Sequence, residues 1–311
     1  MINNFLTKTT AGLYCIAGDF YLDPKRAVPV AMISHAHSDH AVPTKGKVYC
    51  TKPTRSFMEH RMFGKSFPDF SNVKFGETFK VNDVAITYYP AGHILGSAQI
   101  LMEYKGERYL YTGDFKTQSD DSCEAFEYVE CNHLITETTF ASPEYQHPDP
   151  VEELQNLMNE KRNVVIGAYA LGKAQRLTQL LTTHCKGRKV YIHPDLIAYH
   201  AMYADHGVSL GEWFHYRRDD FENGSPSFYI VPPAKFKSYG RSLNALKVFA
   251  TGWKQSFYSC DRVLQVSDHA DWPGVIELIS KTKAQKIYTV HGNGNPLKQF
   301  FKDKIEVNII G

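Results

Sequence analysis

The sequence lacks the segments that mark membrane and secreted proteins. In its 311 residues no window approaches the roughly 18 consecutive apolar residues of a membrane span. The N-terminus lacks the apolar stretch and small-residue cleavage site of a signal peptide. The six cysteines include no CxxC pair, which argues against a cysteine zinc site and a disulfide framework. We therefore expect a soluble cytoplasmic protein with reduced cysteines and no membrane partner.

A strong excess of one charge is also missing. The 35 lysines and arginines are nearly balanced by 33 acidic residues, a net charge of +2. The distribution is less even, because residues 151–262 carry fifteen cations against ten acidic side chains. An excess of this size is typical of an ordinary solvated surface. It would acquire a function only beside a site that acts on phosphates.

The order of predicted elements indicates two kinds of architecture. The first 140 residues contain short strand candidates such as 84–90 and 98–104. Asp149 before Pro150 predicts a helix N-terminus, after which strands and helices alternate as in a small parallel α/β layer. The predicted domains are one formed by residues 1–150 and 262–311, and an insertion at 151–261.

The strongest motif is HAHSDH at residues 35–40. Residues two apart in an extended segment point to the same side, so His35 and His37 can bind one ion together. A turn after His37 would let Asp39 and His40 face a second ion. Imidazole and carboxylate ligands suit zinc, manganese or iron. The motif therefore predicts a metal site rather than a solvated polar loop.

Three further candidate ligands follow strand-like segments. His93 lies in AGHILGSA, Asp114 follows Thr-Gly, and His291 precedes a glycine, a residue that allows close backbone approach. Each alone is more typical of a plain loop, whereas together with HAHSDH they indicate a two-metal site. The predicted ligand sets are His35, His37 and His93 for one ion, and Asp39, His40 and His291 for the other, with Asp114 bridging them. Two cations about 3.5–4 Å apart favour hydrolysis by metal-bound water.

These motifs resemble those of the metallo-β-lactamase superfamily. Glu137 in TET, SDHAD at 267–271 and VHG at 290–292 narrow the resemblance to its β-CASP nucleases. The insertion opens with IGAYALGKAQR, which is similar to the start of a β-CASP domain. Five segments resemble the bacterial DNA ligase-associated exonucleases over nearly the whole chain: GLYCIAGDFYLDP, SHAHSDHA, AGHILGSAQI, YTGDFK and SDHADWPG.

The resemblance implies both a fold and an activity. The fold would be α/β (α+β), a four-layer αββα sandwich with an inserted α/β β-CASP domain. The activity would be that of a metal-dependent DNA exonuclease, which hydrolyses phosphodiester bonds through a dinuclear metal-bound hydroxide in DNA repair alongside a DNA ligase. The cofactors would be two divalent ions, zinc or manganese, with iron also compatible. The partner would be DNA that is single-stranded or has free ends.

The resemblance also assigns roles to single residues. His269 would protonate the leaving oxygen, with Glu137 orienting it. Asp23, or alternatively Asp19, would support the metal-binding loop. Lys173 would meet a backbone or terminal phosphate, or else be an ordinary surface lysine. The residues that correspond to the family's metal ligands are His35, His37, Asp39, His40, His93, Asp114 and His291, of which Asp39 and Asp114 also count as catalytic.

One segment departs from this pattern, and alternatives stay open. The subfamily is arginine-rich before SDHAD, whereas this chain has Phe257 and Tyr258, which could stack on bases or lie in a core. An RNA-processing β-CASP nuclease would use the same metal residues. A thioester or lactone hydrolase would need no cationic insertion, and a nucleic-acid-binding scaffold would need no complete ligand set. The other eight histidines lack metal-like spacing and are predicted to be surface or hydrogen-bonded residues.

Overall fold

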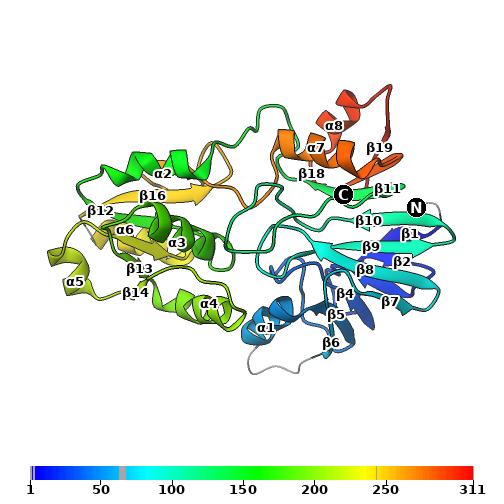
Figure 1. The fold of residues 1–311 in the computed structure, drawn as a ribbon, viewed down its shortest axis with the longest axis horizontal. Coiled ribbons are helices and arrows are strands. Elements are labelled where there is room, and N and C mark those ends of the chain that lie inside the picture. The colour runs from blue at the N-terminus through cyan, green and yellow to red at the C-terminus, as the bar shows by residue number, and fades with distance from the viewer. Residues whose placement is uncertain (1, 3, 63–67, 243, 311) are drawn as a thin grey trace. The chain divides into compact units, whose positions relative to one another are not determined.

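The computed structural model describes residue 2 and residues 4–62, 68–242 and 244–310 (Figure 1). The chain divides into two compact units, each of which is built from separate segments. The first unit comprises Met1–Ser119, Cys123–Gln146 and His269–Gly311, and the second comprises Asp120–Ser122 and His147–Asp268. None of the helices in the described ranges has the length and hydrophobicity to cross a lipid bilayer.

The first unit contains two sheets. One is formed in chain order by β1 (Leu6–Thr9), β2 (Gly12–Cys15), β3 (Phe20–Leu22), β4 (Val30–Met32), β5 (Lys47–Thr51) and β6 (Asp69–Val73). The other has the order β19 (Glu306–Ile309), β18 (Lys286–Gly292), β11 (His133–Thr138), β10 (Glu107–Tyr111), β9 (Ala98–Tyr104), β8 (Val84–Pro90) and β7 (Thr78–Val81).

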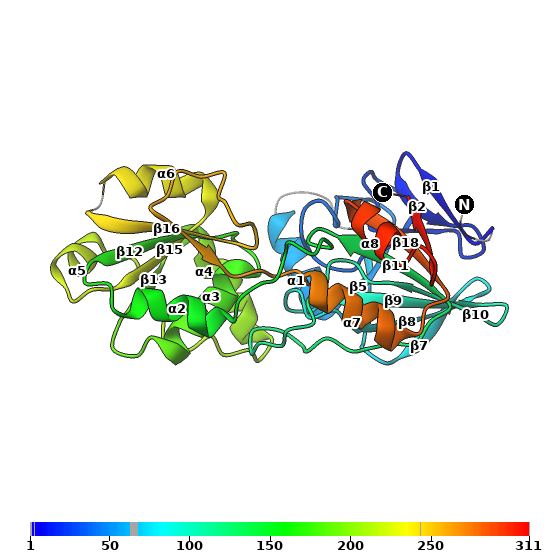
Figure 2. The same cartoon turned by 90° about the horizontal axis from the view of Figure 1, so that it is seen from above.

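Alternation along the strands explains how these sheets are covered. Ile86 of β8 and Met102 of β9 point into the core between the sheets, whereas Leu101 points to the opposite face. On that opposite face lie α7 (Trp272–Thr282) and α8 (Asn295–Phe300) (Figure 2). α1 (Lys52–Arg61) packs against β5 and β6 of the other sheet. The unit therefore has the helix–sheet–sheet–helix layers that the sequence predicts.

The second unit is a parallel sheet with helices on both faces. Its order is β14 (Phe214–His215), β13 (Val190–Ile192), β15 (Phe228–Val231), β12 (Asn163–Gly167), β16 (Ala245–Thr251) and β17 (Arg262–Gln265). Leu177 of α3 (Lys173–His184) packs on one face of β12, and Phe236 of α6 (Pro233–Ser242) packs on the other. The remaining helices are α2 (Pro150–Met158), α4 (Pro194–Asp205) and α5 (Arg218–Asn223).

The end of the insertion differs from the sequence prediction. Residues 262–268 were assigned to the first domain, but β17 pairs in parallel with β16 and completes the sheet of the second unit. At the other end, Asp149 caps α2 as predicted, because its carboxylate accepts the backbone N–H of Val151 at 2.7 Å.

Candidate active site

The predicted ligands of the first ion lie together in the first unit. The segments after β4, β8 and β10 contribute His35, His37, His93 and Asp114. Nδ1 of His37 lies 3.1 Å from Nε2 of His35 and 3.1 Å from Nε2 of His93. Oδ2 of Asp114 is 3.6 Å from Nε2 of His35 and 3.9 Å from Nε2 of His93. One ligand atom from each residue lies within 4.8 Å of all the others.

This donor set fits a divalent cation. Zinc–nitrogen bonds of about 2.0–2.1 Å place tetrahedral ligand atoms about 3.4 Å apart, close to the separations of these ring nitrogens. Burial lowers the pKa of His35 well below its usual value, so its ring is neutral, as a metal ligand must be. Three imidazole nitrogens and a carboxylate suit zinc, manganese or iron.

The predicted ligands of the second ion are linked through pairwise contacts. Nε2 of His40 lies 3.3 Å from Oδ2 of Asp114 and 3.7 Å from Oδ2 of Asp39. The ring of His291 lies 5.0 Å from that of His40, measured between centroids. The Asp39 side chain is 74% exposed, whereas Asp114 is buried. Asp114 therefore contacts both predicted sets, as a bridging carboxylate would.

Asp23 holds the segment that carries the histidines. Its carboxylate accepts the backbone N–H of Ser34 at 2.7 Å, the Ser34 hydroxyl at 2.5 Å and the Tyr111 hydroxyl at 2.9 Å. It also lies 2.8 Å from Nδ1 of His40, which leaves Nε2 of that ring facing Asp114. Asp19, the alternative, instead accepts the exposed Tyr14 hydroxyl. These are the contacts expected of a carboxylate that supports metal ligands.

A β-bulge shapes the strand end that carries His291. The register between β11 and β18 shifts at Glu137 and Thr138, so that Thr138 pairs with Gly292. Gly292 has φ 78°, and a Cβ there would lie 2.5 Å from the Thr138 carbonyl oxygen, so only glycine fits. Bulges of this kind turn side chains toward a site beside a sheet edge.

Glu137 and His269 form a pair beside the first cluster. Nδ1 of His269 lies 2.7 Å from Oε1 of Glu137, and the His269 ring lies 4.7 Å from the His93 ring. The Phe115 backbone N–H donates to the same Glu137 oxygen at 3.1 Å, and the Thr139 hydroxyl donates to the other. Asp114, Glu137 and His269 can also bring one ligand atom each within 4.8 Å.

Comparison with known proteins shows which proteins the chain resembles. No protein-family profile matches the chain. It is 29% identical to "Probable DNA ligase" of Opitutus terrae over 96% of the chain and 30% of that protein. It is 26% identical to "Endoribonuclease YSH1" of Gibberella zeae over 50% of the chain and 23% of that protein. The chain thus spans less than a third of either relative.

The fold is shared with a solved structure. A protein of unknown function from Enterococcus faecalis V583 superposes with a TM-score of 0.66 at 13% identity, covering 91% of this chain and 79% of its own. At this identity the likeness shows the fold alone, and it agrees with the α+β metallo-β-lactamase-like fold that the motifs predict. The relatives and the ordered motifs together support the metallo-β-lactamase superfamily and its β-CASP type for this chain.

The sequence does not reveal some of the residues that support the site. The Arg61 guanidinium donates hydrogen bonds to the carbonyl oxygens of Ala36 and Ala41, and so holds the HAHSDH segment from α1. Ser34 and Tyr111 bind Asp23 from two different strand ends. No spacing in the sequence signals these contacts, because each residue type is common on surfaces and in cores.

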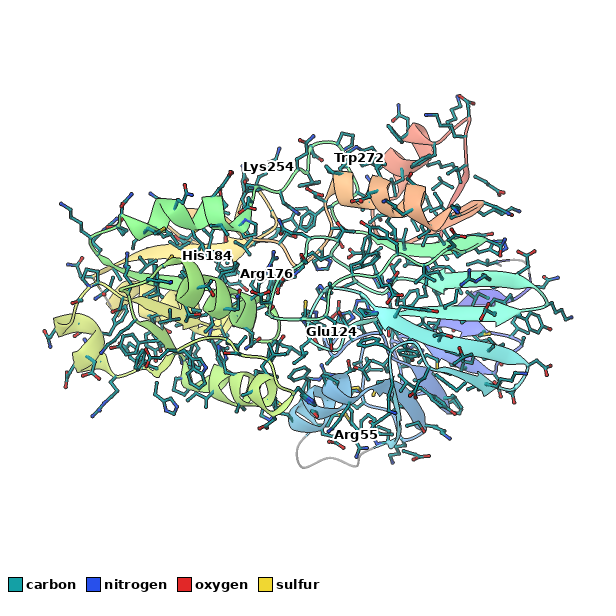
Figure 3. The ribbon with its side chains drawn as sticks, in the orientation of Figure 1. Arg55, Glu124, Arg176, His184, Lys254 and Trp272 are labelled. Carbon is teal, nitrogen blue, oxygen red and sulfur yellow. The ribbon has the colours of Figure 1, made fainter. Side chains whose placement is uncertain are left out.

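Lys173 is not the surface lysine of the second alternative, and its contact with phosphate stays a prediction. Lys173 is buried, and its Nζ lies 3.0 Å from Oδ2 of Asp268 and donates to the Val266 carbonyl oxygen at 2.7 Å. One turn later on α3, Arg176 lies 3.0 Å from the Asp120 carboxylate and donates to the Ser267 carbonyl oxygen (Figure 3). These cations bind the segment that precedes His269 in the chain.

Other cations of the insertion are also engaged within the second unit. Arg188 donates to four backbone carbonyl oxygens, and its guanidinium carbon lies 4.2 Å from the centroid of the Phe228 ring. At the surface, Arg162 pairs with Glu160, and Arg218 pairs with Glu222. The excess positive charge of the insertion is therefore a weaker argument for phosphate binding than its residue count indicates.

Proposed function

We propose that this chain is a metal-dependent DNA exonuclease that acts in the cytoplasm, in DNA repair alongside a DNA ligase. The observation that carries the proposal is the Glu137–His269 pair next to the histidine cluster. A binding scaffold or a structural metal site has no need of an oriented, partly exposed imidazole beside its ligands. Hydrolysis of a phosphodiester does need such an imidazole, because the leaving alkoxide must be protonated.

His269 and Glu137 are suited to that proton transfer. Nδ1 of His269 donates to Glu137, so Nε2 is left to give a proton to the leaving oxygen. Glu137 accepts further hydrogen bonds from Phe115 and Thr139, which fix the carboxylate and stabilise its charge. A fixed carboxylate favours the protonated imidazole. Two divalent ions, zinc or manganese, held by the seven predicted ligands would activate water and neutralise phosphate charge.

The likeness to a DNA ligase supports DNA as the substrate. The matched part of "Probable DNA ligase" covers nearly all of this chain and 30% of that protein, so a related unit occurs within the same polypeptide as that ligase. A ligase requires correctly trimmed ends, which an exonuclease supplies. Single-stranded ends and a functional association with a DNA ligase are therefore the proposed partners.

RNA processing is the second candidate. "Endoribonuclease YSH1" aligns with half of the chain at 26% identity, close to the identity of the ligase match. Since the same metal ligands and acid hydrolyse either backbone, only the substrate separates these two functions.

The experiment compares matched DNA and RNA oligonucleotides labelled at either end. The protein is supplied with zinc or manganese, and His269→Ala serves as the inactive variant. His184→Ala, an exposed histidine on α3, is the matched control (Figure 3). The proposal expects stepwise shortening of DNA with little loss of RNA, abolished in His269→Ala and retained in His184→Ala. Cleavage of RNA alone would establish the second candidate and reject the first.

A further inference from the structure

In the second unit, three aromatic side chains are exposed in the loops that follow β12 and β16. Phe257 is 94% exposed, Tyr169 55% and Trp253 38%. In the described part of this unit, the only other large hydrophobic side chain exposed to this degree is Met158, at the end of α2. Isolated exposed apolar residues need no explanation, but a group of aromatic residues at one edge does.

The strand pairing brings Tyr169 and Trp253 to neighbouring strand ends. β12 and β16 are parallel neighbours, with Gly167 paired to Phe249, so their carboxyl ends lie side by side. Tyr169 comes two residues after β12 ends, and Trp253 comes two residues after β16 ends. Burial raises the pKa of the Tyr169 phenol, and the nearby Tyr258 raises it further. Tyr258 lies in the loop that carries Phe257, so this loop comes close to Tyr169.

The loop that carries Phe257 is held at both ends. At its start, the His147 ring lies 3.0 Å from the Gly252 carbonyl oxygen. At its end, Tyr258 stacks on Phe249 with centroids 4.4 Å apart and planes inclined by 20°. Tyr258 therefore belongs to the core, whereas Phe257 beside it points into solvent. Of the two alternatives for this pair, the structure shows burial in the core for Tyr258 only.

A cation accompanies the aromatic side chains. Lys254 is exposed between Trp253 and Phe257 (Figure 3). On the other side of β12, β15 leads into α6, whose first turn carries the exposed Lys235. Of the acidic side chains that follow strands of this sheet, Asp268 after β17 is buried and paired with Lys173. Asp195 follows β13, which is separated from β12 by β15. We call Tyr169, Trp253, Lys254 and Phe257 the aromatic edge.

We propose that the aromatic edge binds a single strand of DNA, with the Phe257 and Tyr169 rings stacking on bases and Lys254 contacting phosphate. Aromatic faces next to cations are how proteins hold single strands without reading their sequence. The proposal rests on the proposed nuclease function, because it names where that substrate's unpaired bases are held.

The test measures binding of a labelled single-stranded oligonucleotide of about 15 nucleotides. A His269→Ala background prevents cleavage during the measurement. Phe257→Ala should weaken binding about tenfold, and Phe257→Trp should restore it, because stacking is worth about 1–3 kcal/mol per base. Phe300→Ala, a 49% exposed phenylalanine of the first unit, is the matched control and should change nothing. Thermal melting confirms that each variant folds.

An abasic oligonucleotide of the same length separates stacking from charge. The Phe257→Ala variant should bind the abasic oligonucleotide as tightly as the unmutated residue allows in the same His269→Ala background, because this oligonucleotide has no bases to stack on Phe257. Lys254→Ala should weaken the binding of both oligonucleotides. It should also reduce the salt dependence of that binding by about one phosphate contact. Equal affinity of Phe257→Ala and the Phe257 protein for the base-bearing strand would overturn the proposal and leave the edge to a protein partner. Failure of the unmutated protein to bind or cleave any DNA would instead reject the proposed function itself.

Discussion

Glu137 and His269 are 132 residues apart in the chain, yet Oε1 of Glu137 lies 2.7 Å from Nδ1 of His269. Glu137 lies in β11, and His269 begins the last segment of the first unit. The pair therefore forms only when the C-terminal segment has joined the sheet. It places an oriented imidazole beside the histidine cluster, and this arrangement distinguishes a hydrolytic site from a structural metal site.

Glu137→Gln tests the charge of that carboxylate. The amide can still accept from Nδ1, but it no longer stabilises a protonated imidazole. We expect single-turnover DNA cleavage to slow about 100-fold, and His269→Ala to slow it by about 10²–10⁴. Metal content, measured by elemental analysis, should match that of the unmutated protein in both variants. Unchanged cleavage rates in both would remove the pair from the mechanism.

Asp23→Ala tests the support of the HAHSDH segment. The substitution leaves the buried Ser34 N–H and Tyr111 hydroxyl without their acceptor and frees the His40 ring. We expect a loss of about 3 kcal/mol in the free energy of unfolding, together with weaker metal binding. Asp19→Ala, which removes an exposed hydrogen bond, should cost less than about 1 kcal/mol by chemical denaturation. Equal costs would show that Asp23 is not the supporting carboxylate.

Lys173→Met tests whether this lysine is structural. It leaves the buried Asp268 carboxylate without its ammonium partner, so the unfolding free energy should fall by about 3–5 kcal/mol. Removing the charge of Asp268 as well, in Lys173→Met/Asp268→Leu, should recover part of that loss. If Lys173 bound phosphate instead, stability would be unchanged and the salt dependence of DNA binding would fall by about one contact.

His200 predicts how the stability of the second unit responds to pH. Burial lowers the pKa of His200 to about 4, from an ordinary value of 6.5. The unfolded chain therefore takes up the proton first as pH falls. The stabilisation by the neutral ring is complete above pH 6.5 and is lost between pH 6.5 and about 4, amounting to about 3 kcal/mol. Denaturation at pH 7.5 and 4.5 should show a smaller loss for His200→Gln than for the unmutated protein.

The sequence predicts the strands and the candidate site well for one physical reason. The motif residues follow buried strands, and β8, β10, β11 and β18 run in the same direction, so their carboxyl ends meet at one edge. The N-caps of two helices were also predictable, because Asp149 and Asp271 each precede a proline in the first turn of a helix. Strand ends and helix caps are predictable because they depend on residues nearby in the chain or on the direction of the strands.

Features that depend on distant neighbours were not predictable. α1 escaped because its sequence, KPTRSFMEHR, buries only Thr54, Phe57 and Met58, too few apolar residues for a helical pattern. Its Arg61 therefore went unnoticed as a support of the metal-ligand segment. Lys173 looked like a surface lysine because its partner, Asp268, lies 95 positions away in the chain. No local pattern reveals such a pairing.

The most direct test of the account is a metal titration of DNA cleavage. Protein stripped of metal is given increasing zinc or manganese, and hydrolysis of end-labelled single-stranded DNA is followed together with the number of ions bound. We predict no cleavage without metal and full activity when two ions are bound per chain. His37→Ala removes the ring nitrogen that lies between those of His35 and His93. It should lower both the rate of cleavage and the number of ions bound. Cleavage by the metal-free protein, or none with two ions bound, would contradict the account.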